Sequence, residues 1–195
     1  MPQDRTRKIV VTGILGAISI FLGLTRWGFL PWFGGVSITI MQVPVIIGAV
    51  LEGPWVGLAI GLIFGVFSMI QAAVAPNGPV DTIFTNPLIS ILPRLFIGPV
   101  AWLVWKGLKR WPVIGLIGAG IAGSLTNTVL VLLMIGLTPS ALQVLNLASA
   151  QSWAVLGGIA VANGLPEAAV SAVLTLAVVA AWRGIRVGRR QGANI

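Results

Sequence analysis

Arg94 lies inside a long apolar stretch, and its chemistry is the first feature of this chain that needs an explanation. A charged side chain within a membrane span costs roughly 3 kcal/mol on insertion scales, so it normally faces a partner or a watery cavity. Its planar guanidinium can hold a carboxylate through two parallel hydrogen bonds. Asn86 and Ser90 precede it at intervals of four residues. The three side chains share one face if a helix begins near Asn86.

Two later apolar stretches carry polar residues at a similar depth. Counted from the basic or proline end of each stretch at 1.5 Å per residue, Arg94, Asn127 and Glu167 lie at about 18, 22 and 24 Å. Asn127 and Asn163 can donate to and accept from hydroxyls or amides, and Glu167 can accept from a ligand or orient Arg94. We therefore predict a binding site for a polar or anionic solute, lined by Asn86, Ser90, Arg94, Asn127, Asn163 and Glu167.

The same residues have structural explanations that the sequence leaves open. Arg94 and Glu167 could simply pair with each other as two charges buried in a membrane. Asn86, followed by Pro87, and Pro166 are typical of helix starts, where asparagine caps and proline fits the first turn.

Apolar stretches recur along the whole chain and must position these side chains. The composition is 57% hydrophobic and 8% charged, which a soluble domain could hardly carry. We expect an all-α integral membrane protein, a bundle of six transmembrane helices that forms one transmembrane substrate-binding domain over residues 1–195. The expected spans are residues 8–25, 38–51, 54–74, 88–106, 112–136 and 163–183. The second is short and contains Pro44, so it is expected to be tilted, kinked or shielded by neighbours.

Basic residues give the orientation of the bundle. Residues 5–8, 106–110 and 183–190 hold ten of the twelve Lys and Arg residues, and six spans place all three clusters on one side. The positive-inside rule makes that side cytoplasmic, so both termini are expected inside. The net charge of +8 is explained by topology, and we expect no nucleic-acid partner.

The first outer connection, residues 26–37, mixes aromatic residues with glycines. We predict a lid over the solute site formed by Trp27, Phe29, Trp32 and Phe33. The alternative is a belt of aromatic residues at the membrane interface, which is equally compatible with this composition.

Small residues at four-residue spacing predict close helix packing. Gly57, Gly61 and Gly65 are assigned to internal packing. Gly13 and Ala17 have the same spacing, and spacing alone favours internal packing over a contact with another subunit.

Several chemistries lack their usual residues. The chain has no Cys and no His, no phosphate-binding loop and no paired-carboxylate metal motif. We therefore predict no catalytic residues, no metal site and no enzyme activity. Two other classes stay open: a proton-coupled secondary transporter, with Glu167 as the buried proton-linked group, and a membrane enzyme acting on lipid-linked substrates through Asp81, Glu167 and Arg94.

The chain resembles the S components of energy-coupling factor (ECF) vitamin transporters, particularly the pantothenate-transporter-like branch. The resemblance spans nearly the whole chain. It rests on the six-helix layout, the small-residue segment at 13–17, the segment at 86–94 that ends in Arg94, and the segment at 163–167 that ends in Glu167.

This resemblance implies a vitamin-binding subunit that joins a transmembrane T component and two ABC ATPases. The implied protein lies in the cytoplasmic membrane of a prokaryote, needs no cofactor of its own and relies on its partners to hydrolyse ATP. Pantothenate is the specific prediction, since its carboxylate suits Arg94. The family docks on the T component through an Ala-x-x-x-Ala motif, which appears here as Gly13 and Ala17, so the resemblance favours that interface over internal packing.

Overall fold

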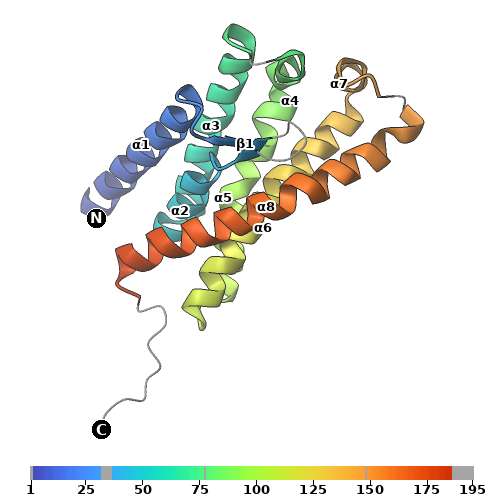
Figure 1. Cartoon of the computed structure of the whole chain (residues 1–195). Helices are drawn as coiled ribbons and strands as arrows, with labels where there is room; N and C mark the ends of the chain where they lie inside the picture. The colour runs from blue at the N-terminus through green and yellow to red at the C-terminus, as the bar shows by residue number, and fades with distance from the viewer. Residues whose placement is uncertain (1, 32–36, 77, 148, 186–195) are drawn as a thin grey trace.

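The structure, a computed structural model, describes residues 2–31, 37–76, 78–147 and 149–185. It is a helical bundle with a small two-stranded sheet (Figure 1). Five helical segments are long and apolar enough to cross a membrane. They comprise α1 (Pro2–Leu24), α3 (Pro54–Val74), α4 (Pro87–Ser90) continuing into α5 (Leu92–Gly107), α6 (Pro112–Leu137), and α8 (Ser149–Arg183).

Proline marks where most of these helices begin. It occupies one of the first two positions of α3, of the two segments α4 and α5, and of α6. Proline is tolerated there because its missing N–H would have no partner inside the helix and its fixed φ suits the first turn. The starts of the predicted spans at residues 54, 88 and 112 are therefore encoded locally.

The second predicted span, residues 38–51, is wrong in both form and extent. Residues Ser37–Thr39 form strand β2, and the helix that follows, α2 (Val43–Glu52), has only ten residues. Such a helix is about 15 Å long, half the thickness of a bilayer core. This short helix is stabilised by the helices around it. It packs against α1, α3, α5, α6 and α8, and residues 43–50 are all buried.

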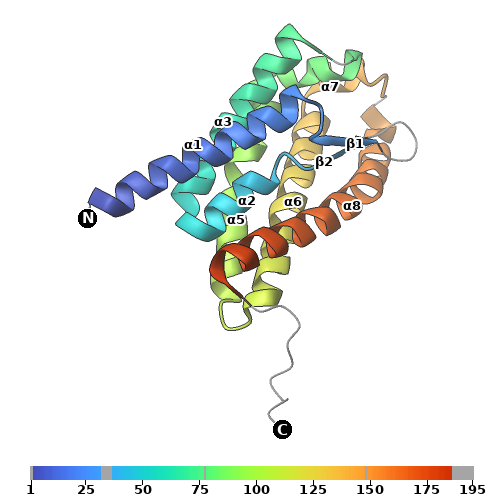
Figure 2. The ribbon, with the colours of Figure 1, turned by 60° about the vertical axis from the view of Figure 1, so that its left-hand side comes forward.

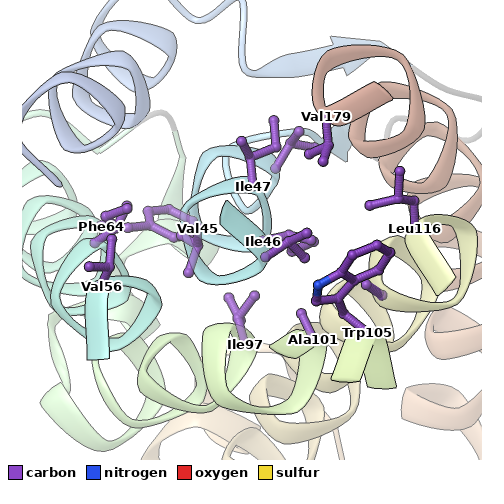
Figure 3. Close-up of a cluster of buried hydrophobic side chains, with 14 of the residues drawn as sticks. Val45, Ile46, Ile47, Val56, Phe64, Ile97, Ala101, Trp105, Leu116 and Val179 are labelled. Atoms are coloured by element: carbon purple, nitrogen blue, oxygen red, sulfur yellow. The ribbon is translucent and has the colours of Figure 1, made fainter. Parts of the chain in front are cut away.

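The core of the bundle surrounds α2. Ile46 points between α5, α6 and α8, and Figure 3 shows it close to Ala101, Trp105 and Leu116. On the other side of α2, Val45 faces Phe64 of α3. The short helix is thus the centre of the apolar packing.

Strand β1 (Phe29–Pro31) pairs antiparallel with β2, with Leu30 opposite Ile38. The hairpin runs from the end of α1 across to α8, over the beginning of α2 (Figure 2). We call this the hairpin end of the bundle. The all-α expectation is therefore corrected by one small sheet.

The connections between the third and fourth and between the fifth and sixth predicted spans, residues 75–87 and 137–162, are partly helical. Residues 75–87 contain the 3-10 helix η2 (Pro79–Thr85). In residues 137–162, α7 (Pro139–Val144) is followed by α8, which begins at Ser149 and not near Asn163. With 35 residues, α8 is about 52 Å long.

Basic residues gather at the opposite end, which we call the basic end. Arg7 of α1 forms an ion pair of 2.7 Å with Glu52 at the end of α2. Arg183 at the end of α8 donates a 2.8 Å hydrogen bond to the Val50 carbonyl and lies over the Trp105 ring. The beginning of α1 and the end of α8 therefore meet the same end of α2.

Candidate functional site

Arg94 is buried near the start of α5, where the sequence creates an unpaired carbonyl. Pro93 has no N–H, so the carbonyl of Ile89 four residues earlier loses its helical partner. The Nη1 atom of Arg94 donates to that oxygen at 2.6 Å. One nitrogen of the guanidinium thus repairs the break between α4 and α5, which is a structural role.

The rest of the guanidinium lies among aromatic rings. Its Cζ is 5.3 Å from the centroid of Phe64 and 5.2 Å from that of Phe84, distances at which the ring quadrupoles attract a cation. Its Nε is buried and has no hydrogen-bond partner. Arg94 therefore keeps a donor for a group that the described residues do not supply.

The glycines on one face of α3 determine the position of the Arg94 backbone along the bundle. A methyl group added to Gly61 would collide with the Arg94 carbonyl, and one added to Gly65 would lie 2.8 Å from the Cα of Ile91. The prediction that these glycines pack internally is confirmed: they let the backbone of α5 approach α3 directly. This close approach holds the Arg94 backbone in place.

Glu167 is buried on α8 and binds the hairpin. Its Oε1 accepts from the backbone N–H of Thr39 at 2.8 Å, and its Oε2 accepts from the Thr128 hydroxyl at 3.2 Å. Its charge and that of Arg94 attract each other, but among the described residues no ion pair within 4.0 Å joins the two. Glu167 therefore connects α8, α6 and the hairpin.

The two predicted asparagines differ in burial. Asn127 of α6 is 7% exposed, and its Oδ1 has no partner. Asn163 is half-buried and lies one turn before Glu167 on α8. Asn127 thus offers a free acceptor within the bundle, next in sequence to the Thr128 that contacts Glu167.

Asn86 and Ser90 have structural uses. Asn86 caps α4, since its side chain accepts from the N–H of Leu88 at 3.0 Å, so the helix-start alternative is confirmed for this residue. Ser90 is fully buried and donates to the Gly65 carbonyl at 3.1 Å. The helix begins directly after Asn86, and α4 continues into α5 with an interruption only at Ile91.

Gln42, which precedes α2, is a buried polar residue that the sequence analysis missed. Its Nε2 lies 3.3 Å from Ser124 Oγ of α6 and 3.5 Å from Ser171 Oγ of α8, while its Oε1 has no partner. A signal existed, since Gln42 interrupts an otherwise apolar stretch from Ile40 to Leu51.

A sequence model of the ECF transporter substrate-specific component matches residues 7–179. The chain belongs to this family. It is 30% identical to the pantothenic acid transporter PanT of Lactococcus lactis subsp. cremoris over 93% of this chain and 96% of that protein. It is 31% identical to the pantothenate transporter PanT of Leuconostoc mesenteroides subsp. mesenteroides over 69% of this chain and 70% of that protein. As an ECF substrate-specific component, the chain is a membrane transport protein and not an enzyme, which excludes the lipid-linked-substrate alternative.

Two further predictions for this ECF component concern its surface. Gly13 and Ala17 lie on an exposed face of α1, and a methyl group added to Gly13 would meet nothing within 4 Å, so internal packing is wrong for this pair. Of the predicted lid residues, Trp27 is 73% exposed. Phe29 lies in β1, and Trp32 and Phe33 lie outside the described residues.

Proposed function

We propose that this chain captures pantothenate outside the cell for ATP-driven uptake by partner subunits. Both relatives described above carry the name of a transporter of this vitamin. One alignment covers more than nine-tenths of both chains, so the whole bundle is comparable. The solute is therefore proposed from the relatives first and from the chemistry of the site second.

The observation that carries the proposal is that two buried polar atoms, one a donor and the other an acceptor, have no hydrogen-bond partner. Arg94 Nε is a donor without a partner, and Asn127 Oδ1 is an acceptor without a partner. Buried polar groups are normally hydrogen-bonded, and an unpaired one destabilises the fold. A solute with a carboxylate and hydroxyl or amide donors would satisfy both atoms, and pantothenate has these groups.

We further propose six membrane crossings with both termini in the cytoplasm. Hairpin and α2 together would make the second crossing. The charges at the basic end, including the Arg7–Glu52 pair and Arg183, support this orientation through the positive-inside rule. The hairpin end would then face outward in the cytoplasmic membrane of a prokaryote.

The energy source is proposed to lie outside this chain. A T component would dock on the exposed face of α1 that carries Gly13 and Ala17, where small residues allow close helix contact. Two ABC ATPases bound to the T component would hydrolyse ATP. This chain would need no cofactor.

Titration of the purified chain tests the proposal. We expect pantothenate, and not other vitamins of a panel, to bind at one molecule per chain and to raise the unfolding temperature. A retained solute, identified by mass spectrometry after purification from cells grown with the vitamins, gives the same information without a choice of ligand. Failure to bind any vitamin would contradict the proposal.

The remaining alternative is proton-coupled transport through Glu167. Vesicles that contain the chain alone separate the two. We expect no accumulation of pantothenate driven by a proton gradient, because the proposed uptake takes its energy from ATP hydrolysis by partner subunits. Proton-driven accumulation without ATPases would support the alternative and reject ours.

A further inference from the structure

A second polar cluster lies about one helical turn deeper in the bundle than Glu167. It consists of Gln42, Ser124, Ser171 and Thr175, all of which are fully buried, and we call it the floor cluster. Ser171 follows Glu167 by one helical turn toward the basic end, so the floor cluster begins about 6 Å deeper than Glu167. Both α6 and α8 therefore carry polar residues down from the predicted site to this level.

Apolar packing closes the bundle directly below Gln42. One turn further along α2, Ile46 is fully buried, and a methyl group on Gly123 would meet its Cγ1 at 2.6 Å. On the side of α2, the polar strip therefore ends at Gln42, which directly precedes that helix. This position is the floor of the polar region and not a part of the apolar core.

The floor cluster is only partly paired. The Gln42 amide nitrogen reaches the two serine hydroxyls at 3.3 and 3.5 Å, and its Oε1 and the Thr175 hydroxyl have no partner. Rotation of the amide by half a turn would exchange Oε1 for Nε2 and still leave one polar atom unpaired. Because a buried amide costs stability unless it is hydrogen-bonded, this residue needs a partner that packing does not explain.

The chemistry of the missing partner differs from that at Arg94. The floor cluster carries no charge, and an amide together with hydroxyls can both donate and accept. These groups suit a neutral hydroxyl or amide and do not favour an anion. Arg94, by contrast, offers a cation with a free N–H.

We propose that Gln42 is a specificity-determining residue that binds a neutral hydroxyl or amide of the captured solute, at the end of the molecule opposite its carboxylate. The inference rests on the proposed function, since it assigns a role within the same site. The solute class is thereby narrowed to monocarboxylates that also carry a neutral hydrogen-bonding group within reach of Gln42. Gln42 would reject carboxylates of similar size that lack this group.

Paired titrations of protein and ligand variants test the role of Gln42. The full chain in detergent is titrated with pantothenate and with analogues that each lack one hydroxyl. Gln42→Met keeps the length of the side chain and removes the amide, and we expect about a tenfold loss of affinity for pantothenate. The analogue that loses most in the unchanged protein should lose no more than about twofold relative to pantothenate in the variant, because the contact is already gone.

Ser19→Ala is the matched control. Ser19 is also fully buried and donates to backbone carbonyls of Leu15 and Met41, close to Gln42 in the fold but outside the floor cluster. We expect its affinity for pantothenate and its preference among analogues to be unchanged. If Gln42→Met unfolds, Gln42→Asn keeps an amide but withdraws it by one methylene, and the same analogue-specific loss is expected.

The outcomes separate this inference from the proposed function. If the unchanged protein binds pantothenate and Gln42→Met binds it equally well, the role of Gln42 is wrong and the proposed function stands. Equal affinity of the unchanged protein for pantothenate and every analogue has the same meaning. If the unchanged protein binds no pantothenate, both proposals fail together.

Discussion

Arg94 combines a structural role with a free donor. Its Nη1 satisfies the Ile89 carbonyl that Pro93 leaves open, while Nε has no partner. Truncation to alanine would therefore disturb both the junction of α4 with α5 and the proposed site. A substitution that keeps the charge and one donor is needed to separate the two.

Arg94→Lys is expected to weaken pantothenate binding by about 10- to 100-fold, because the ammonium cannot reproduce the planar fork that holds a carboxylate. The unfolding temperature should change little, since the ammonium can still donate to Ile89. Calorimetric titration and thermal unfolding measure the two effects. Unchanged affinity in the folded variant would remove Arg94 from the site.

Asn127→Ala separates binding from stability more cleanly. Its Oδ1 has no partner in the fold, so we expect a loss of about tenfold or more in affinity for pantothenate and no loss of stability from that atom. Thr126→Ala is the control on the same helix, because the Thr126 hydroxyl donates to its own helix at Ala122. A control that lost as much affinity would point to a general effect on α6.

At this scale the sequence predicted Arg94, Asn127 and Glu167 as buried polar residues within the spans. Spacing could not show which polar atoms the fold would already use: Asn86 caps a helix, and Ser90 binds a carbonyl of α3. It could not show Gln42 as a site residue either, because its partners Ser124 and Ser171 are far away in the chain. Hydrogen bonds between distant residues require the tertiary structure.

Among the elements, the contact between α3 and α5 is the tightest constraint on the site. Gly61 and Gly65 touch the backbone around Arg94, so side-chain volume there must move α5. The spacing of the glycines predicted the contact, because small residues at this interval make a smooth face. Their partner helix became visible only in the fold.

Gly61→Ala is expected to destabilise the protein by about 1–3 kcal/mol, since the added methyl overlaps the Arg94 carbonyl and forces the helices apart. Gly13→Ala, where the methyl meets nothing within 4 Å, should be neutral. Thermal or denaturant unfolding in detergent compares the two. Equal stability of both variants would show that α3 and α5 can separate without cost.

The hairpin depends on Glu167 for its attachment to α8. In Glu167→Ala the N–H of Thr39 loses its acceptor, so its hydrogen exchange should become faster by about tenfold or more. Thr128→Val tests the weaker contact and should have a smaller effect, because the Oε1 bond to Thr39 remains. Unchanged exchange in Glu167→Ala would mean that other contacts hold the strand.

The ends of the spans at residues 54–74, 88–106 and 112–136 were predicted within a few residues, because hydropathy and proline starts are local signals. The second span was not, since its hairpin and ten-residue helix are stabilised by five surrounding helices. The sequence also does not predict the early start of α8. This helix begins at Ser149, well before Asn163, where the predicted span begins.

At the scale of the whole molecule, α1 has an exposed apolar face that is open to partners. In α1, which packs only on α2 and α3 among the helices with substantial contact, most apolar side chains point outward. Gly13→Leu is expected to impair assembly with a T component and its ATPases while pantothenate binding stays intact. Copurification measures assembly, and normal copurification would reject this interface.

Gly157→Leu controls for added bulk on the surface. Gly157 is exposed on α8, and a methyl group there also meets nothing within 4 Å. We expect normal assembly in this variant. Loss of assembly in both variants would indicate a general defect of insertion in place of a specific interface.

The orientation of the bundle is directly testable because the chain has no cysteine. Single cysteines are introduced as Val80→Cys at the hairpin end and Lys109→Cys at the basic end, both exposed. In intact cells, an impermeant maleimide should label the first and reach the second only after the membrane is permeabilised. The reverse pattern would invert the proposed topology.

The ten-residue helix α2 also bears on how the chain is made. A segment of about 15 Å cannot cross a bilayer by its own hydrophobicity, so its crossing exists only once α5, α6 and α8 surround it. During synthesis those helices emerge after it. The proposed second crossing would therefore be completed late, as a step of folding within the membrane, and in chains truncated before α8 this segment should not reach its final position.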